Sequence, residues 1–252
     1  MQTSLPLERF TPASPYQRFQ FLLRRAFWKA QGKTYLHFLH IGKTAGTTLK
    51  ENLMFIGTTH KFRLIFHAHQ MPLSKIPEGE KVACFLRHPG ERFASGFYHH
   101  KREGAPVYHK KNSTSQKMGF LIFPELEDLV EGLFDSDPFR KELAYLTISA
   151  NEHLARPLTF WFPSIKEIED RKNDILFIGL QEHFNYDFER LRKLLVINKW
   201  PSEPQKLHSN PKGSSYAISP NTRCLLESFL EEDILIFNYL IKRFHPKGIS
   251  KE

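Results

Sequence analysis

The sequence is poor in cysteine. Its 252 residues include two, Cys84 and Cys224, and they form neither a C-x-x-C pair nor a Cys/His metal spacing. We expect two buried free thiols, Cys84 in an apolar strand and Cys224 in an amphipathic helix. This pattern excludes a disulfide scaffold and a cysteine-ligated metal centre, and nothing in it requires an oxidising compartment.

Long apolar runs are also missing. No stretch approaches the roughly 18 apolar residues that span a bilayer, residues 1–33 lack a signal-peptide core, and there is no internal repeat. We therefore expect a soluble, cytoplasmic protein with one α/β domain, the usual result for this length. The expected divisions are an N-terminal extension at 1–32, the domain at 33–245 and a tail at 246–252.

Positive charge is in excess, with 36 Lys and Arg against 27 Asp and Glu and a net charge of +9. This balance favours anionic ligands. No nucleic-acid-binding motif occurs and the cations do not follow one helix, so nucleic acid is not an expected partner. Residues 18–30 predict a basic amphipathic helix, which can touch an anionic membrane peripherally or pack on its own domain.

The most informative stretch is residues 34–48, TYLHFLHIGKTAGTT. An apolar run ends in Gly42-Lys43-Thr44 and leads into a helical pattern, which predicts a buried strand, a tight loop and a helix N-terminus. Free N–H groups and the positive end of the helix dipole make such a loop a phosphate site. Lys43 adds a point charge, and Thr44, Thr47 and Thr48 add hydroxyl groups.

This stretch fits the P-loop pattern G-x-x-x-x-G-K-[ST] only in its second half. The first glycine would fall at position 37, which is a histidine inside the predicted strand. The long glycine loop that wraps a triphosphate is therefore missing. A shorter loop suits a single 5′ phosphate-type group better.

Residues 81–95, KVACFLRHPGERFAS, repeat the arrangement of strand, polar end and helix, with Pro89 in the first helical turn. A P-loop NTPase usually ends this strand in an acid that organises Mg²⁺. Here the strand ends in Arg87, and Ser95 follows about two helical turns later. The pattern indicates a site that holds anion directly, without a metal.

Together the two stretches resemble the sulfotransferases that use 3′-phosphoadenosine 5′-phosphosulfate (PAPS). His40–Leu49 resembles their 5′-phosphosulfate loop, and Arg87–Ser95 resembles their 3′-phosphate motif, R-x-P-x-x-R-x-x-S. The resemblance covers residues 33–103 and returns weakly at 175–240. It is closest to the Golgi carbohydrate sulfotransferases of the heparan 2-O and 6-O type and their bacterial counterparts.

The resemblance implies a three-layer, P-loop-like α/β fold with a central parallel sheet. It also implies transfer of sulfuryl from PAPS, without a metal, to an acceptor hydroxyl, which we expect on a carbohydrate. The residues implied to bind PAPS are Gly42, Lys43, Thr44, Ala45, Gly46, Thr47 and Thr48 around the 5′ group, Arg87 and Ser95 at the 3′-phosphate, and Lys212, Gly213 and Ser214 in a late loop. The role of Arg92 stays open: it can contact the ligand, or it can lie on the helix surface and pair with Glu91 or Glu51.

Two histidines, His67 and His69, follow the alternating residues 62–66 and resemble the His-x-His of the 2-O type enzymes. A neutral imidazole can take the proton of an attacking alcohol. By motif position we expect His69 as the catalytic base and His67 as its neighbour, although two polar residues can also simply close an edge strand. Lys43 is the third expected catalytic residue, neutralising the leaving oxygen.

Parallel strands are predicted near 34–41, 62–67, 81–86 and 175–179, with their carboxyl ends meeting at the ligand site. Residues 104–119 predict a polar loop whose cations border either the acceptor cleft or solvent. Residues 124–155 predict two short helices, and one long helix follows Ser219. Two rival functions remain: a nucleotide kinase or NTPase-like phosphotransferase, and a non-catalytic anion- or polysaccharide-binding protein.

Overall fold

A parallel sheet forms the centre of this protein. The computed structural model describes residues 14–54, 56–105, 109–197 and 218–245. Within them lie β1 (Thr34–Phe38), β2 (Phe62–Phe66), β3 (Lys81–Leu86) and β4 (Ile175–Leu180), in the order β2-β1-β3-β4. Their near-continuous apolar sequences are typical of parallel strands that are covered on both faces. The predicted parallel sheet is confirmed.

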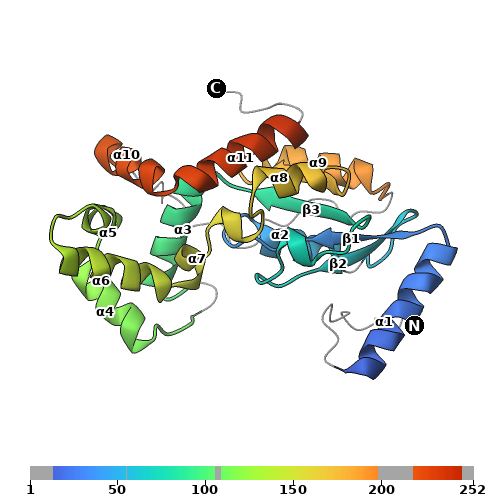
Figure 1. The fold of residues 1–252 in the computed structure, drawn as a ribbon, viewed down its shortest axis with the longest axis horizontal. Coiled ribbons are helices and arrows are strands. Elements are labelled where there is room, and N and C mark those ends of the chain that lie inside the picture. Colours follow the sequence, from blue (N-terminus) through green and yellow to red (C-terminus); the bar gives the residue numbers. More distant parts are fainter. Residues whose placement is uncertain (1–13, 55, 106–108, 198–217, 246–252) are drawn as a thin grey trace.

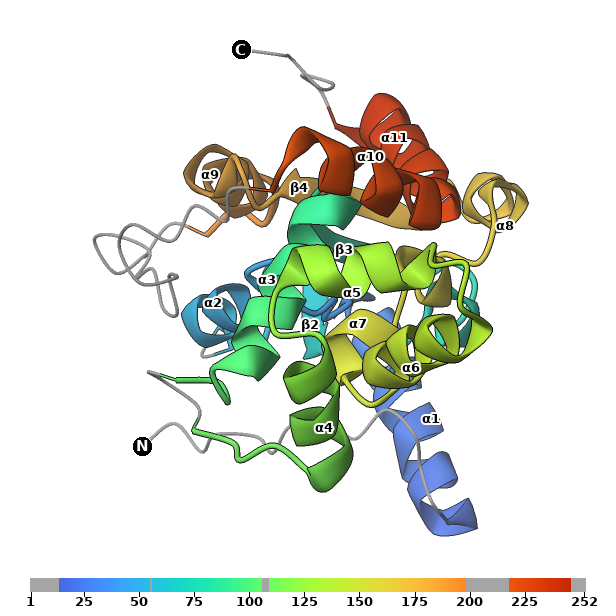
Figure 2. The same ribbon diagram turned by 90° about the vertical axis from the view of Figure 1, so that its left-hand side faces the viewer.

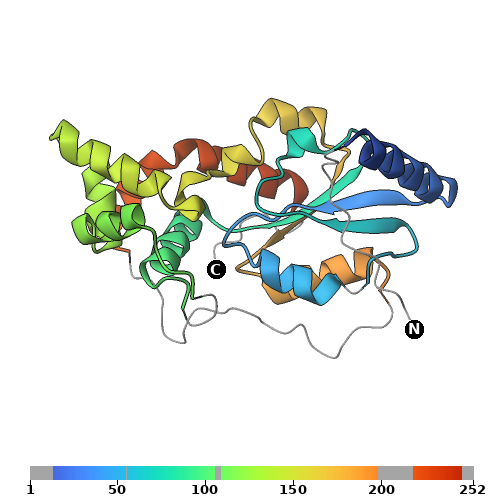
Figure 3. The same ribbon diagram turned by 90° about the horizontal axis from the view of Figure 1, so that it is seen from below.

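Helices cover both faces of this sheet. Figure 3 shows α2 (Gly46–Leu53) and α9 (Phe184–Leu194) on one face, with α8 (Ile165–Asp170) and α11 (Glu231–Phe244) on the other. Leu49 of α2 and Phe188 of α9 pack with Phe38 of β1. Ile168 and Leu240 pack with Cys84 on the opposite face. The three-layer α/β fold is therefore confirmed.

A helical group stands at the carboxyl ends of the strands (Figures 1 and 2). It consists of α3 (Pro89–Lys101), α4 (Thr114–Ile122), α5 (Leu126–Leu133), α6 (Pro138–Ser149), α7 (Glu152–Ala155) and α10 (Pro220–Phe229). Phe93, Leu129, Ala144 and Leu226 belong to its own apolar core. Two short 3-10 helices, η1 (Leu73–Lys75) and η2 (Leu158–Phe160), complete the described elements.

Four expectations about local structure are wrong. Residues 124–155 form three helices, α5, α6 and α7, where two were predicted. The loop predicted at 104–119 gives way to α4, because Ser113 and Gln116 form a capping box that starts a helix. The long helix after Ser219 is two helices, which part at Leu230 (φ −102°, ψ 20°). Cys224 is exposed, because it lies on the side of α10 away from the buried residues Thr222 and Leu226.

The N-terminal helix α1 (Pro15–Ala30) forms as predicted and packs on the domain through one face. The Phe21 ring lies 6.4 Å from that of Tyr35, Arg25 forms an ion pair with Glu80, and Trp28 lies under the guanidinium of Arg63. These contacts place α1 at the amino ends of the strands (Figure 1). Among the described residues, no helix has the length and apolar character needed to cross a membrane.

Candidate active site

A cavity of about 1150 Å³ opens at the carboxyl ends of the strands. Its wall is built from the residues that follow β1, β2, β3 and β4, together with parts of α3 and α7. In open α/β sheets, ligands bind at this edge because the loops after the strands converge there. The two sequence stretches of greatest interest, near Lys43 and Arg87, thus meet at one site.

The loop from β1 to α2 turns through two residues in the left-handed region, Lys43 (φ 67°) and Ala45 (φ 64°). Such angles are strained in residues other than glycine and collect at functional sites. Ala45 is also the N-cap of α2 and has no side chain that can accept from the first N–H groups. These N–H groups and the helix dipole therefore form an anion-binding nest.

Part of this loop faces the cavity and part supports it from behind. Lys43, Ala45, Gly46, Thr47 and Thr48 line the cavity. Thr44 is buried, and its hydroxyl donates to the carbonyl of Ile41 at 2.9 Å. That hydroxyl therefore stabilises the loop instead of serving as the ligand donor proposed from the sequence.

The two glycines of this loop leave room for histidine rings. A Cβ on Gly42 would lie 2.7 Å from Nδ1 of His153, and one on Gly46 would lie 2.3 Å from Cδ2 of His40. Real Cβ atoms essentially never come this close. A larger residue at either position would therefore push a histidine ring aside, and Gly42 is not on the cavity wall.

Lys43 lies in a buried and positively charged setting. Burial, together with the neighbouring charges of Arg102 and Arg87, lowers its pKa from 10.5 to about 8. An anion bound beside the amine would raise this pKa, because an opposite charge favours the protonated form. Lys50 and Lys110 also line the cavity, so that its four lysines and arginines outnumber the carboxylates of Glu51, Glu152 and Glu182 and favour an anionic ligand.

Arg87 and Ser95 reach the same cavity from β3 and α3. Arg87 directly follows the end of β3, and Ser95 lies in the second turn of α3. The Arg87 guanidinium is 3.9 Å from the carboxylate of Glu91, too far for a direct hydrogen bond. Its planar set of donors suits a phosphate.

His69 lines the cavity in an orientation that defines its tautomer. Its Nδ1 lies 3.0 Å from the carbonyl oxygen of His40. Because a carbonyl only accepts, Nδ1 carries the proton and Nε2 is the basic nitrogen. Burial lowers the pKa of His69, so the ring is neutral and able to accept a proton at neutral pH.

Other histidines gather around His69. The His40 ring lies 3.9 Å from that of His69, and the His153 ring 5.5 Å away at a near-perpendicular angle. His99 and His100 of α3 are 5.4 and 5.1 Å from His153. Burial lowers the pKa of His40 to about 3, of His99 to about 3 and of His100 to about 4, which keeps these rings neutral.

Comparison with known protein families identifies the family of this chain. A sequence profile of the sulfotransferase family matches residues 29–240, which is most of the chain. This chain belongs to the sulfotransferase family. No curated protein and no solved structure matches it. Membership in this family supports sulfuryl transfer as the chemistry of the cavity.

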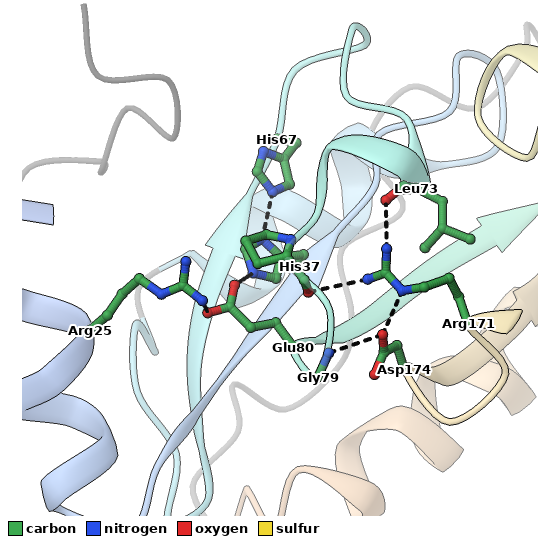
Figure 4. A network of polar contacts seen from close by, with 9 residues as sticks. Arg25, His37, His67, Leu73, Gly79, Glu80, Arg171 and Asp174 are labelled. Carbon is green, nitrogen blue, oxygen red and sulfur yellow. Dashed lines mark hydrogen bonds and ion pairs between the residues drawn. The ribbon is translucent and has the colours of Figure 1, made fainter. Parts of the chain in front are cut away.

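His67 of this sulfotransferase does not line the large cavity. Its Nε2 lies 2.8 Å from Nδ1 of His37, and Nε2 of His37 lies 2.8 Å from a Glu80 oxygen (Figure 4). Burial lowers the pKa of His37, so His37 is neutral: it donates to Glu80 and accepts from His67. The ion pair of Glu80 with Arg25 continues this chain to α1. His67 thus anchors the segment that carries His69.

A second group of contacts fixes the other end of that segment (Figure 4). Arg171 donates to Asp174 at 2.6 Å and to the carbonyl of Pro77 at 3.1 Å. Asp174 also accepts from the backbone N–H of Gly79 at 3.1 Å. The connection from β2 to β3 is therefore tied to the sheet on both sides of His69.

Arg92 fits neither of its two expected roles. It is buried, donates to the carbonyl of Arg156 at 2.9 Å and lies 3.5 Å from Asp233, which belongs to α11. Asp233 also accepts from the backbone N–H groups of Leu158 and Thr159. Arg92 therefore joins α3 to α11 inside the protein, away from the cavity.

Sequence reasoning missed part of the cavity wall. His153 and Glu152 come from α7, and His99 comes from α3, where it adjoins His100. The wall also includes 181–186, where the sequence predicted no site residue. Glu182 accepts from the backbone N–H of His88 there.

The predicted basic loop is divided in the structure. Lys110 lines the cavity, whereas Lys101 pairs with Glu125 at 2.8 Å and Arg102 donates to backbone carbonyls. Lys212, Gly213 and Ser214, expected over the adenosine, lie outside the described residues.

Proposed function

We propose that this sulfotransferase moves the sulfuryl group of PAPS to a hydroxyl of a carbohydrate acceptor, with His69 as the general base. The observation that carries the proposal is the placement of His69, Lys43 and Arg87 on one cavity wall. They bring together a base, a group for the leaving oxygen and a phosphate ligand. Sulfuryl transfer needs these three roles within reach of one ligand.

The proposed reaction is an in-line displacement at sulfur. The acceptor oxygen forms a bond to sulfur, the bond from sulfur to the 5′-phosphate oxygen breaks, and adenosine 3′,5′-bisphosphate leaves. His69 Nε2 receives the hydroxyl proton as the new bond forms. Lys43 neutralises the charge that develops on the leaving oxygen, which is electrostatic stabilisation by a preorganised group.

The donor site is supported by the shape and charge of the loop. The nest at the N-terminus of α2, formed by the positive φ angles of Lys43 and Ala45, suits a single phosphate-type group. Arg87 and Ser95 lie further along the same wall, where the 3′-phosphate would bind. An arginine after β3, where NTPases usually carry an acid, favours PAPS over Mg²⁺-ATP.

A carbohydrate acceptor is supported by the remaining wall. Lys110, Glu152 and Gln181 offer hydrogen-bonding groups, and Tyr186 offers an aromatic ring with 43% of its surface exposed. A sugar needs many polar partners together with an apolar face to stack on. The absence of a required metal and the cytoplasmic location stay predictions.

The donor site is tested by calorimetric titration with adenosine 3′,5′-bisphosphate, 5′-AMP and Mg-ATP in parallel. We expect metal-independent binding of the bisphosphate. Arg87→Gln should weaken it by about tenfold to a hundredfold, since a charged hydrogen bond is lost, and should affect 5′-AMP much less. Arg140→Gln, at an exposed arginine far from the cavity, is the matched control. Preference for Mg-ATP would favour a phosphotransferase instead.

Turnover separates an enzyme from a binding protein. Release of the bisphosphate from PAPS is followed with a panel of glycans, for the natural chain and for His69→Asn. We expect glycan-dependent release that falls by about a hundredfold or more in the variant, the usual contribution of a general base. Bisphosphate binding without glycan-dependent release would leave a non-catalytic binding protein.

A further inference from the structure

The proposed function makes no use of the outer face of α1. Five large apolar side chains on this helix expose more than half of their surface: Tyr16, Phe19, Leu22, Leu23 and Phe27. Single exposed apolar residues are ordinary, but a contiguous group on one element marks an interaction site. The group covers almost the whole length of α1.

The contacts of α1 define two opposite faces. Phe21, Arg25 and Trp28 follow each other at i, i+4 and i+7 and hold the helix on the domain. At 3.6 residues per turn, the five exposed apolar residues form one arc that faces away from those anchors. Arg24 borders this arc on one side and Lys29 on the other, and both are exposed.

Charge identifies the partner. Arg24 and Lys29 are the cations that flank the arc, and α1 contains no acidic residue. Pairing two copies through this face would set the flanking cations of one helix against those of the other. An anionic lipid surface instead accepts the apolar arc among its acyl chains and neutralises the cations with its headgroups.

We propose that the outer face of α1 binds an anionic membrane surface, with the helix lying in the plane of the headgroups. The anchoring face keeps the helix attached to the domain, so binding requires no unfolding of α1 from the sheet. Because α1 lies at the amino ends of the strands and the cavity at their carboxyl ends, the bound protein keeps its cavity open to dissolved ligands (Figures 1 and 3).

The test is sedimentation of the full chain with vesicles of phosphatidylcholine, alone or mixed with phosphatidylserine. We expect binding to the mixed vesicles that is at least about tenfold stronger and that weakens as salt is raised. Phe19→Glu combined with Leu23→Glu should abolish it. Arg24→Gln should weaken it about fivefold, the effect of one cation near an anionic surface.

The matched control is Leu121→Glu combined with Phe139→Glu, which changes two apolar residues at least as exposed but outside α1. We expect this variant to bind vesicles normally. Equal binding to both vesicle types, or equal loss in both double variants, would overturn the proposal. A dimer in solution that Phe19→Glu with Leu23→Glu dissociates would assign the face to a second copy and also overturn it. Binding of adenosine 3′,5′-bisphosphate should not change in either variant, so the test is independent of the donor site.

Discussion

The pKa of Lys43 determines how the proposed donor site should respond to pH. Burial, together with Arg102 and Arg87, lowers this pKa from 10.5 to about 8. A phosphate dianion bound beside the amine acts in the opposite direction, because an opposite charge favours the protonated form. Binding of adenosine 3′,5′-bisphosphate should therefore raise the pKa of Lys43 and take up a proton wherever the free amine is deprotonated.

The size of the effect follows from this pKa. With a value of about 8, the free amine is deprotonated in about a quarter of the molecules at about pH 7.5 and in about three quarters at about pH 8.5. If the ligand binds only the protonated form, the apparent Kd rises about tenfold between about pH 7 and about pH 9. The nearby histidines do not change charge in this range, because burial lowers the pKa of each one.

The assay is calorimetric titration in two buffers that differ in ionisation enthalpy, such as Hepes and Tris. The difference in heat between the buffers measures proton uptake. Working above about pH 7 keeps the phosphates of the ligand largely dianionic, since their second pKa is about 6. Lys43→Arg is the matched control, because it keeps the charge and does not titrate in this range.

We expect proton uptake and a rising Kd in the natural chain and neither effect in Lys43→Arg. A Kd in the natural chain that stays constant from about pH 7 to about pH 9, without proton uptake, would refute the reasoning. It would mean that the amine does not face the bound 5′ group.

Three further predictions concern Gly46, the proposed base His69 and the buried pair of Arg92 with Asp233. Gly46→Ala should lower kcat by about tenfold to a hundredfold, because the added Cβ displaces the His40 ring beside the base, and it should cost little folding stability. The control is Gly90→Ala, where the added Cβ meets only ordinary contacts, and it should have near-normal kinetics. Because the pKa of His69 is lowered, the base stays unprotonated and kcat should stay steady as the pH falls through about 6.5, with the acid limb of the pH profile below that value. An acid limb at or above about pH 6.5 would argue against His69 as base. Asp233→Ala should lower the free energy of unfolding, measured by urea titration, by about 3–5 kcal/mol, because it leaves Arg92 buried without its ion-pair partner. A loss below about 1 kcal/mol would show that the pair contributes little.

The strands and the two motif loops were predictable because their signals are local. The apolar runs at 34–38 and 81–86 are long enough to identify strands, and the residues after them identify the loops. Helix α4 was missed because its start depends on a capping box of only two residues, within a stretch of polar composition. The break at Leu230 was missed because the apolar stripe continues through it, while the second helix is held by the buried Asp233.

The sequence by itself determined the parallel α/β sheet, the anion-binding loop with Lys43, the arginine after β3 and the family to which the chain belongs. These features depend on residues that are near neighbours along the chain. Only the tertiary structure decided the partners of Arg92 and His67 and the histidines that surround His69. Those contacts join residues far apart, 141 positions for Arg92 with Asp233 and 30 for His37 with His67. Such pairs are set by how strands and helices pack, which no local pattern of residue types encodes.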